Sequence, residues 1–166
     1  NYTGCMIGYH SVPVIVDAEQ WGIDGWDHGV ALSAMVQAAD SMHLGLDAYT
    51  ELGFIPSDHE HESVSKTLEY AFDDACISRY AARHGEDQLA ARFAQRASSW
   101  KNLVNPETGF IQAKRQGAWV EGFDPREVNF NFTEANGWQY LFAPVHDVAG
   151  QIDIFGGDEG YLTRLE

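Results

Sequence analysis

Apolar residues recur at spacings of three and four along much of the chain, which is the spacing of one face of an α-helix. The longest run of this pattern ends at His84-Gly85, a basic last turn followed by a residue that stops helices. Ser57 and Glu60 have the spacing of a capping box, so we expect the helix to begin within residues 59–63. Its apolar face comprises Val64, Leu68, Ala71, Phe72, Ala75, Cys76 and Tyr80.

Three further stretches show helical spacing. We expect one helix from Asp27 to about Met42, one from Asp87 to Leu103, and one over residues 138–155 that is broken near Pro144. The residues expected to face inward are Val30, Leu32, Met35, Val36 and Ala39 in the first, Leu89, Phe93, Ala97 and Trp100 in the second, and Trp138, Leu141, Phe142, Val145, Val148, Ile152 and Phe155 in the third.

The remaining segments carry other patterns. Residues 8–20 suit either a helix that begins near Pro13 or a buried strand, and residues 44–58 are rich in turn formers. Residues 108–120 alternate around a glycine and predict a small hairpin, whereas the Asn-rich segment 124–136 predicts a loop. The pattern therefore predicts an all-α fold with one small hairpin.

Composition narrows the class of protein. The 166 residues include 25 Asp and Glu against 10 Lys and Arg, a net charge of −15, and 45% of them are hydrophobic. This is a folding sequence that would repel nucleic acid and anionic membranes, and its longest apolar run, VPVIV, is too short to span a bilayer. Cys5 and Cys76 are expected to be buried free thiols.

The ends of the sequence suggest a piece of a longer polypeptide. The chain opens just before an apolar stretch and stops directly after an apparent helix start, DEGYLTRL, at residues 158–165.

Several carboxylates could carry chemistry. Glu69 and Asp73 are four residues apart on the longest predicted helix, beside Asp74, and could serve acid/base catalysis, a cation or a sugar. Alternatively they form a solvated face or ion pairs with Lys66 or Arg79.

The run His59-Glu60-His61-Glu62 offers imidazole and carboxylate groups, which are good metal ligands. It lacks the HExxH spacing, and a solvated first helical turn with acids near the helix dipole explains it more simply.

The segment TEANGWQY, residues 133–140, combines a carboxylate, two amides and two aromatic rings, a composition typical of carbohydrate sites. The alternative is a capped helix start with Trp138 in the core. Phosphate-binding, serine-hydrolase and EF-hand motifs are absent from the sequence.

These segments, in this order, resemble the central part of the glycoside hydrolase family 92 α-mannosidases. The resemblance runs nearly end to end and is weakest over residues 19–50. The matching phrases are GYHSVPVIVDA (Gly8 to Ala18), GFIPSDHEHESVSKTLEYAFDDACI (Gly53 to Ile77), WKNLVNPETGFIQAK (Trp100 to Lys114), WVEGFDPREVN (Trp119 to Asn129) and TEANGWQYLFAPVHDVAGQIDIFGG (Thr133 to Gly157).

The resemblance implies a calcium-dependent, exo-acting α-mannosidase that releases mannose with inversion, α-1,2 linkages being the expected substrate. It implies that residues 1–166 are part of an (α/α)6 barrel, with an N-terminal β-sandwich and the C-terminal part of the barrel outside this chain. It also implies an exported bacterial parent protein, periplasmic or at the cell surface, that acts on mannose-containing glycans.

By the same resemblance, Glu134 is the general acid, and Asn136, Trp138 and Gln139 orient it or line the sugar pocket. Such an acid must be protonated near neutral pH, which burial beside aromatics such as Trp138 and Phe132 would favour. Three weaker candidates for substrate binding are Glu62, Tyr70 and Asp74.

The general base and most calcium ligands are expected beyond Glu166. A non-catalytic carbohydrate-binding or scaffold segment therefore remains an alternative, as does another (α/α)6 enzyme such as a lyase or a glucosidase.

Overall fold

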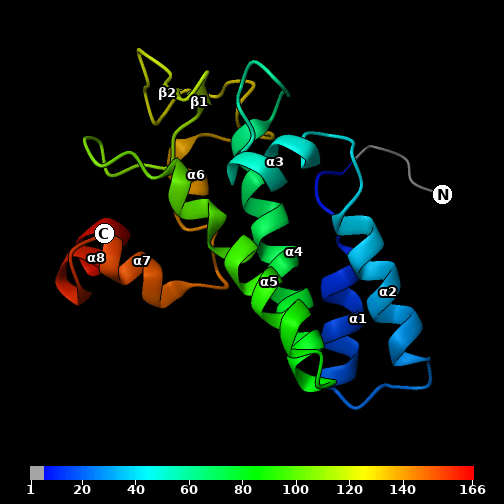
Figure 1. Ribbon diagram of the computed structural model, residues 1–166. Coiled ribbons are helices and arrows are strands. Elements are labelled where there is room, and N and C mark those ends of the chain that lie inside the picture. The colour runs from blue at the N-terminus through cyan, green and yellow to red at the C-terminus, as the bar shows by residue number, and fades with distance from the viewer. Residues whose placement is uncertain (1–5) are drawn as a thin grey trace.

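The computed structural model describes residues 6–166, and the regular secondary structure of these residues is helical apart from one small hairpin (Figure 1). The strands β1 (Lys114–Arg115) and β2 (Ala118–Trp119) pair antiparallel as a hairpin. Across the described residues, no helix has the length and apolar character needed to cross a membrane. The helices are α1 (Ser11–Gln20), α2 (His28–Ala39), α3 (Leu46–Leu52), α4 (Ser63–Arg83), α5 (Asp87–Ala97), the 3-10 helix η1 (Ser98–Leu103), α6 (Gly137–Tyr140), α7 (Val148–Ile154) and α8 (Asp158–Leu165). The predicted all-α fold with one small hairpin is confirmed.

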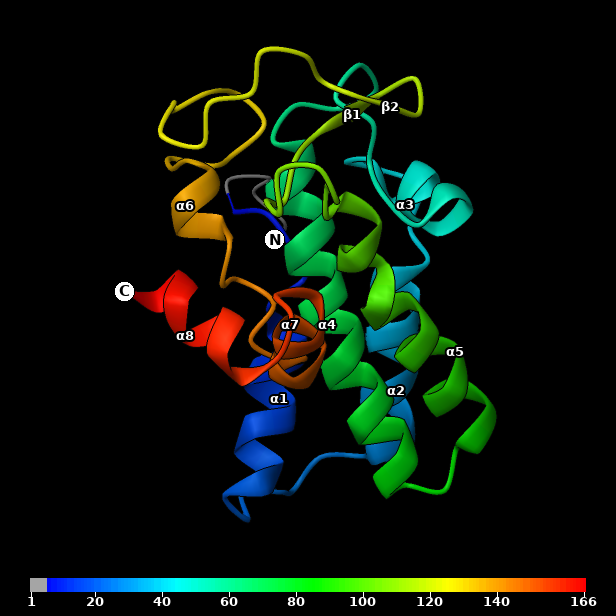
Figure 2. The same ribbon diagram turned by 90° about the vertical axis from the view of Figure 1, so that its left-hand side faces the viewer.

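Helix α4 lies at the centre, with α1, α2 and α5 packed along it; α2 and α5 run antiparallel to α4, and α1 runs parallel to it (Figures 1 and 2). The middle and C-terminal part of α4 are covered by one apolar cluster in which Ile77 and Phe93 are fully buried. Burying each of these side chains stabilises the fold by roughly 1.5–3 kcal/mol. Cys76 is a buried free thiol in this cluster, as predicted, whereas Cys5 lies outside the described residues.

A second apolar cluster surrounds the N-terminal half of α4. It joins Val64 and Leu68 of α4 to Trp100 of η1, to Ile111 before the hairpin and to Phe132 in the Asn-rich loop. Segments far apart in the sequence therefore meet at this end of α4, where Figures 1 and 2 show the hairpin and α6.

The choice between helix and strand for residues 8–20 is settled by α1. Pro13 lies in its first turn, where the missing N–H needs no partner within the helix. The expected helix at residues 27–42 forms as α2 with Asp27 as its N-cap, but it ends at Ala39, and Val30 is exposed rather than inward.

One helix was not predicted. Residues 46–52 form α3 because Leu46 and Tyr49 are buried, and glycines at both of its ends adopt left-handed backbone angles. Those glycines, Gly45 and Gly53, gave the segment its turn-like pattern.

The last two predicted helices are each divided. Residues 98–103 continue α5 as the 3-10 helix η1. Helices α6 and α7 replace the broken helix expected over residues 138–155, and Val145 and Val148, which lie at and just after the break, are exposed rather than inward. The predicted stop at Gly156-Gly157 and the helix start at residues 158–165 are confirmed.

Candidate active site

The Asn-rich loop docks onto the first turn of α4. The backbone N–H of Glu62 donates to the carbonyl oxygen of Phe130 at 2.6 Å, and that of Val64 donates to the carbonyl oxygen of Asn131 at 3.1 Å. The N–H of Thr133 donates to Ser65 Oγ at 2.8 Å. The first amides of a helix lack partners within it, so the loop supplies the cap that α4 would otherwise need.

The capping box expected between Ser57 and Glu60 is therefore wrong. Helix α4 begins at Ser63 with no side-chain cap, and the N–H of Ser57 donates instead to the carbonyl oxygen of Lys114 at 2.8 Å.

Two carboxylates flank this junction, and both have unusual backbone angles. Glu62 and Glu134 have φ of 55° and 52°, in the left-handed region that side chains other than glycine rarely adopt. Such positions cost free energy and cluster at functional sites. Both line one surface pocket of about 420 Å³, together with His61, Val128, Asn129, Phe130 and Phe132. The chain therefore brings together two of the predicted site residues that are 72 positions apart in the sequence.

Asn136 and Gln139 cap each other at the start of α6. Asn136 Oδ1 accepts from the N–H of Gln139 at 3.1 Å, and Gln139 Oε1 accepts from the N–H of Asn136 at 3.2 Å. The interpretation of this segment as a capped helix start is confirmed. These two bonds fix the direction of the chain two residues after Glu134.

Trp138 does not lie in the core, contrary to the second half of that interpretation. Its side chain is 40% exposed and meets Phe110 edge-on, with ring centroids 4.7 Å apart. Glu134 is likewise exposed, so residues 6–166 do not supply the burial that the sequence-based mechanism expects.

Sequence reasoning missed Phe130, which is 88% exposed at the rim of the pocket. Asn129 Oδ1 accepts from the N–H of Asn131 at 3.0 Å, and this turn directs Phe130 outward while Phe132 is buried. An asparagine side chain readily accepts from the backbone N–H two residues later, so the repeated Asn-Phe pair at residues 129–132 is the signal for such a turn.

Asp74 belongs to a different, buried network. It accepts hydrogen bonds from Tyr9 Oη at 2.5 Å, Tyr49 Oη at 3.0 Å and Arg96 Nε at 2.8 Å. Burial raises the pKa of Asp74 to about 6, although Arg96 and the two tyrosine hydroxyls act in the opposite direction. Asp74 lies roughly 18 Å along α4 from Glu62, so it does not line the pocket.

Tyr70 also lies in this interior. Its hydroxyl donates to the carbonyl oxygen of Leu44 at 3.0 Å, and its ring stacks on Tyr9 with centroids 5.4 Å apart. Tyr70 and Asp74, both on α4, therefore bond to the segment before α1 and to the α2–α3 region, which is a structural role.

The predicted pair of Glu69 and Asp73 faces neither Lys66 nor Arg79. Asp73 is fully buried and accepts from the N–H of Tyr9 at 2.7 Å, and His10 Nδ1 lies 3.0 Å from it. His10 Nε2 lies 3.4 Å from Glu69. The interpretations as a solvated face or a pair with Lys66 or Arg79 are therefore wrong for Asp73. The hydrogen bond with Asp73 raises the pKa of His10.

The His59–Glu62 run does not converge on one point. His59 Nε2 pairs with Asp47 at 3.1 Å, and His61 Nδ1 pairs with Glu60 at 2.8 Å. Glu60 also lies 3.0 Å from Lys66 Nζ. The exposed imidazoles agree with the interpretation of this run as a solvated turn.

Among the side chains of residues 6–166, no group of three or more carboxylates comes together to bind calcium. Among the described side chains, one group of three His, Cys, Asp or Glu residues brings its ligand atoms within 4.8 Å of one another, and it contains Glu19, His28 and His84. Calcium prefers six to eight oxygen ligands, so two imidazoles and one carboxylate do not fit it.

Comparison with known proteins finds glycosidases by family model, by sequence and by structure. The model of the "Glycosyl hydrolase family 92 catalytic domain" matches residues 1–166. A curated protein of Arthroderma benhamiae described as an uncharacterized secreted glycosidase is 25% identical over 96% of this chain and 26% of its own length.

Two solved structures from Bacteroides thetaiotaomicron superpose closely. A family GH92 inverting mannosidase is 36% identical over 99% of this chain and 24% of its own, with a TM-score of 0.95. A family GH92 α-mannosidase in complex with mannoimidazole is 37% identical over 99% of this chain and 23% of its own, with a TM-score of 0.93. The chain thus spans about a quarter of the length of these relatives.

Proposed function

The chain belongs to the family of glycosyl hydrolase family 92 catalytic domains, and from that premise we propose that the protein is an exo-acting α-mannosidase that releases mannose with inversion, using Glu134 as general acid. Its all-α fold is part of the (α/α)6 barrel of these enzymes. The observation that carries the proposal is the pocket at the N-terminus of α4, where Glu134 and Glu62 lie beside an exposed aromatic loop.

Inversion divides the chemistry between two carboxyl groups. A protonated carboxyl donates its proton to the leaving oxygen, while a second carboxylate roughly 6.5–9.5 Å away activates a water on the other face of the sugar. In our proposal Glu134 is the first group, and the second comes from a part of the protein outside residues 6–166. Glu62 is held by the loop and hydrogen-bonds sugar hydroxyls.

The residues after Glu134 orient it. Asn136 and Gln139 bond to each other, so they act on the sugar pocket by fixing the turn that carries Glu134. Phe130 offers an exposed aromatic face at the pocket on which a sugar ring stacks, and a bound sugar would displace water from Glu134. Trp138 is exposed on α6 and does not line this pocket, so in the proposal it borders the bound glycan.

Calcium dependence is part of the proposal, although the described residues do not fit the ion. Its oxygen ligands would come largely from elsewhere in the protein, and no step of the chemistry above passes through it. Mannose-containing glycans outside the cytoplasm are the proposed substrates, which agrees with the secreted relative.

The deciding experiment is mannose release from α-1,2-linked mannobiose by the full-length protein, with calcium and again with EDTA. We expect release with calcium and little release with EDTA. Release unaffected by EDTA would remove calcium from the proposal. A protein that binds mannose in calorimetry without releasing it would be the non-catalytic carbohydrate-binding alternative, and activity only on other linkages would exclude the α-1,2 assignment.

A further inference from the structure

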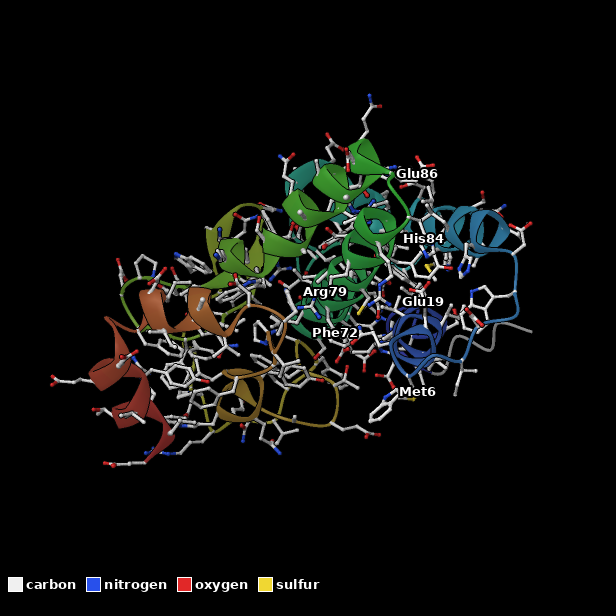
Figure 3. All side chains as sticks on the ribbon, turned by 90° about the horizontal axis from the view of Figure 1, so that it is seen from below. Met6, Glu19, Phe72, Arg79, His84 and Glu86 are labelled. Carbon is white, nitrogen blue, oxygen red and sulfur yellow. The ribbon has the colours of Figure 1, made fainter. Side chains whose placement is uncertain are left out.

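Glu19, His28 and His84 gather at the end of the helices opposite the pocket. Glu19 lies in the last turn of α1, His28 is the first residue of α2, and His84 follows the last residue of α4. Figure 3, which is seen from this end, labels Glu19 and His84 side by side. Three helices that share one apolar core therefore hold the three side chains in place.

The three ligand atoms lie within 4.8 Å of one another, and Glu19 Oε1 is near both imidazoles. Glu19 Oε1 lies 2.6 Å from His84 Nε2 and 3.4 Å from His28 Nδ1. Zinc bonds of 2.0–2.1 Å place neighbouring ligand atoms about 3.4 Å apart. The contact between Glu19 and His28 already has this spacing, and the contact between Glu19 and His84 needs to open by less than about 1 Å.

The surroundings of the group favour its use as a ligand set. Arg83 Nη1 lies 3.1 Å from the other oxygen of Glu19, Oε2, so it orients the carboxylate and leaves Oε1 facing the imidazoles. The rings of His28 and His84 stack with centroids 4.3 Å apart, so the two imidazoles lie side by side next to Glu19.

Solvent reaches the three ligand side chains from one side, and His28 has one further hydrogen-bond partner. The side chains of Glu19, His84 and His28 are 9%, 24% and 38% exposed, so the group opens to solvent on the side of His28. The hydroxyl of Tyr80 lies 2.9 Å from His28 Nδ1, and it accepts from Trp26 Nε1 at 3.1 Å. A cation would take the Nδ1 lone pair in place of this hydroxyl.

We propose that Glu19, His28 and His84 bind one zinc ion, with water as the fourth ligand, and that the ion fastens α1, α2 and α4 together at this end. Two imidazoles and one carboxylate suit zinc rather than calcium. The site lies at the far end of α4 from Glu134, so it is separate from the mannosidase chemistry.

Calorimetric titration of the metal-free full-length protein with zinc tests the site. We expect one zinc equivalent assignable to these residues, with affinity reduced at least about tenfold in Glu19→Gln, His28→Gln and His84→Gln. His59→Gln is the matched control, because His59 is an exposed histidine paired with a single carboxylate, and it should bind zinc as the wild type does. Excess calcium should not displace the zinc.

Cobalt(II) gives a second readout, because tetrahedral cobalt absorbs strongly in visible light. His28→Gln keeps the contact between Glu19 and His84, so it remains informative if the other two variants fail to fold. Unchanged zinc affinity and an unchanged cobalt spectrum in folded His28→Gln would overturn the proposal, as would a wild-type protein that binds no zinc.

Discussion

The backbone N–H of Glu62 donates a 2.6 Å hydrogen bond to the carbonyl oxygen of Phe130, which ties the first turn of α4 to the loop that leads into Glu134. Glu62 and Glu134 are thereby held on one framework although neither has a regular backbone conformation. The surrounding bonds offset the strain of both residues, and this is how a surface loop can present a carboxylate in a fixed place.

Replacing Glu134 with Gln in the full-length protein should reduce turnover of unactivated mannosides by about 10²–10⁴-fold, because proton donation to the leaving oxygen is lost. Aryl mannosides with good leaving groups need less of this help and should be affected less. The comparison is steady-state kcat on both substrates, with Glu127→Gln, an exposed neighbour in the preceding loop, as the control. Near-normal turnover of mannobiose in Glu134→Gln would remove this residue from the mechanism.

Alanine variants of the two phenylalanines of the loop should affect different quantities, Phe132→Ala the stability of the fold and Phe130→Ala the binding of substrate. Phe132→Ala removes a buried ring from the second apolar cluster and should lower the free energy of unfolding by roughly 3–5 kcal/mol. Phe130→Ala should change it by less than about 0.5 kcal/mol, yet raise KM, because Phe130 is exposed at the pocket. Denaturant unfolding and steady-state kinetics of both variants provide the measurement. An unaltered KM in Phe130→Ala would show that the loop aromatic does not contact substrate.

Asn136→Ala should cost roughly 0.5–2 kcal/mol of stability through the lost helix cap. It should also lower kcat, because the chain after Glu134 loses its fixed direction. Asn136→Asp accepts the same backbone hydrogen bond but loses the one that Asn136 Nδ2 donates to the carbonyl oxygen of Arg126 at 3.3 Å, so it should restore both quantities in part. If Asp restores stability but not kcat, Asn136 contacts the sugar itself rather than acting through the turn.

Asp74 should leave a signature in the pH dependence of stability. Its pKa is raised from 3.8 to about 6 in the folded protein, so between these values the folded state holds a proton that the unfolded state has released. The free energy of unfolding of the wild type should therefore fall relative to Asp74→Asn as pH rises from about 4 to about 6. Above about pH 7, where Asp74 is deprotonated in both states, the difference should stay constant.

Chemical denaturation of both proteins at several pH values measures this difference. A difference that is flat or rises across the interval would mean that Arg96 and the tyrosine hydroxyls outweigh burial at Asp74.

The parts of the fold that follow from local chemistry were predictable. The end of α4 at His84-Gly85, the hairpin around Gly117 and the reciprocal caps of Asn136 and Gln139 all depend on residues within a few positions of one another. Sequence spacing alone carries enough information for such features.

The errors concern partners that are distant in the sequence. The start of α4 is determined by the loop around Asn131, and the partner of Asp73 is His10, 63 residues earlier. Periodicity places Asp73 on a helix face but does not tell which segment covers that face. Trp138 likewise packs against Phe110, which lies before the hairpin, and the spacing within residues 133–140 gives no information about this partner. The role of Glu134 comes from family resemblance and stays a prediction.

The bonds that join Glu62 to Phe130 and Val64 to Asn131 run between main-chain atoms only. Every amino acid except proline carries the same N–H and C=O groups, so these contacts impose almost no requirement on side-chain identity. The side chains of Val128 and Phe130 can therefore change without breaking these two bonds, whereas the side chain of Asn129 forms the turn itself. In the proposed mechanism, changes at these two positions would alter contacts with the sugar while the backbone that carries Glu134 keeps its place.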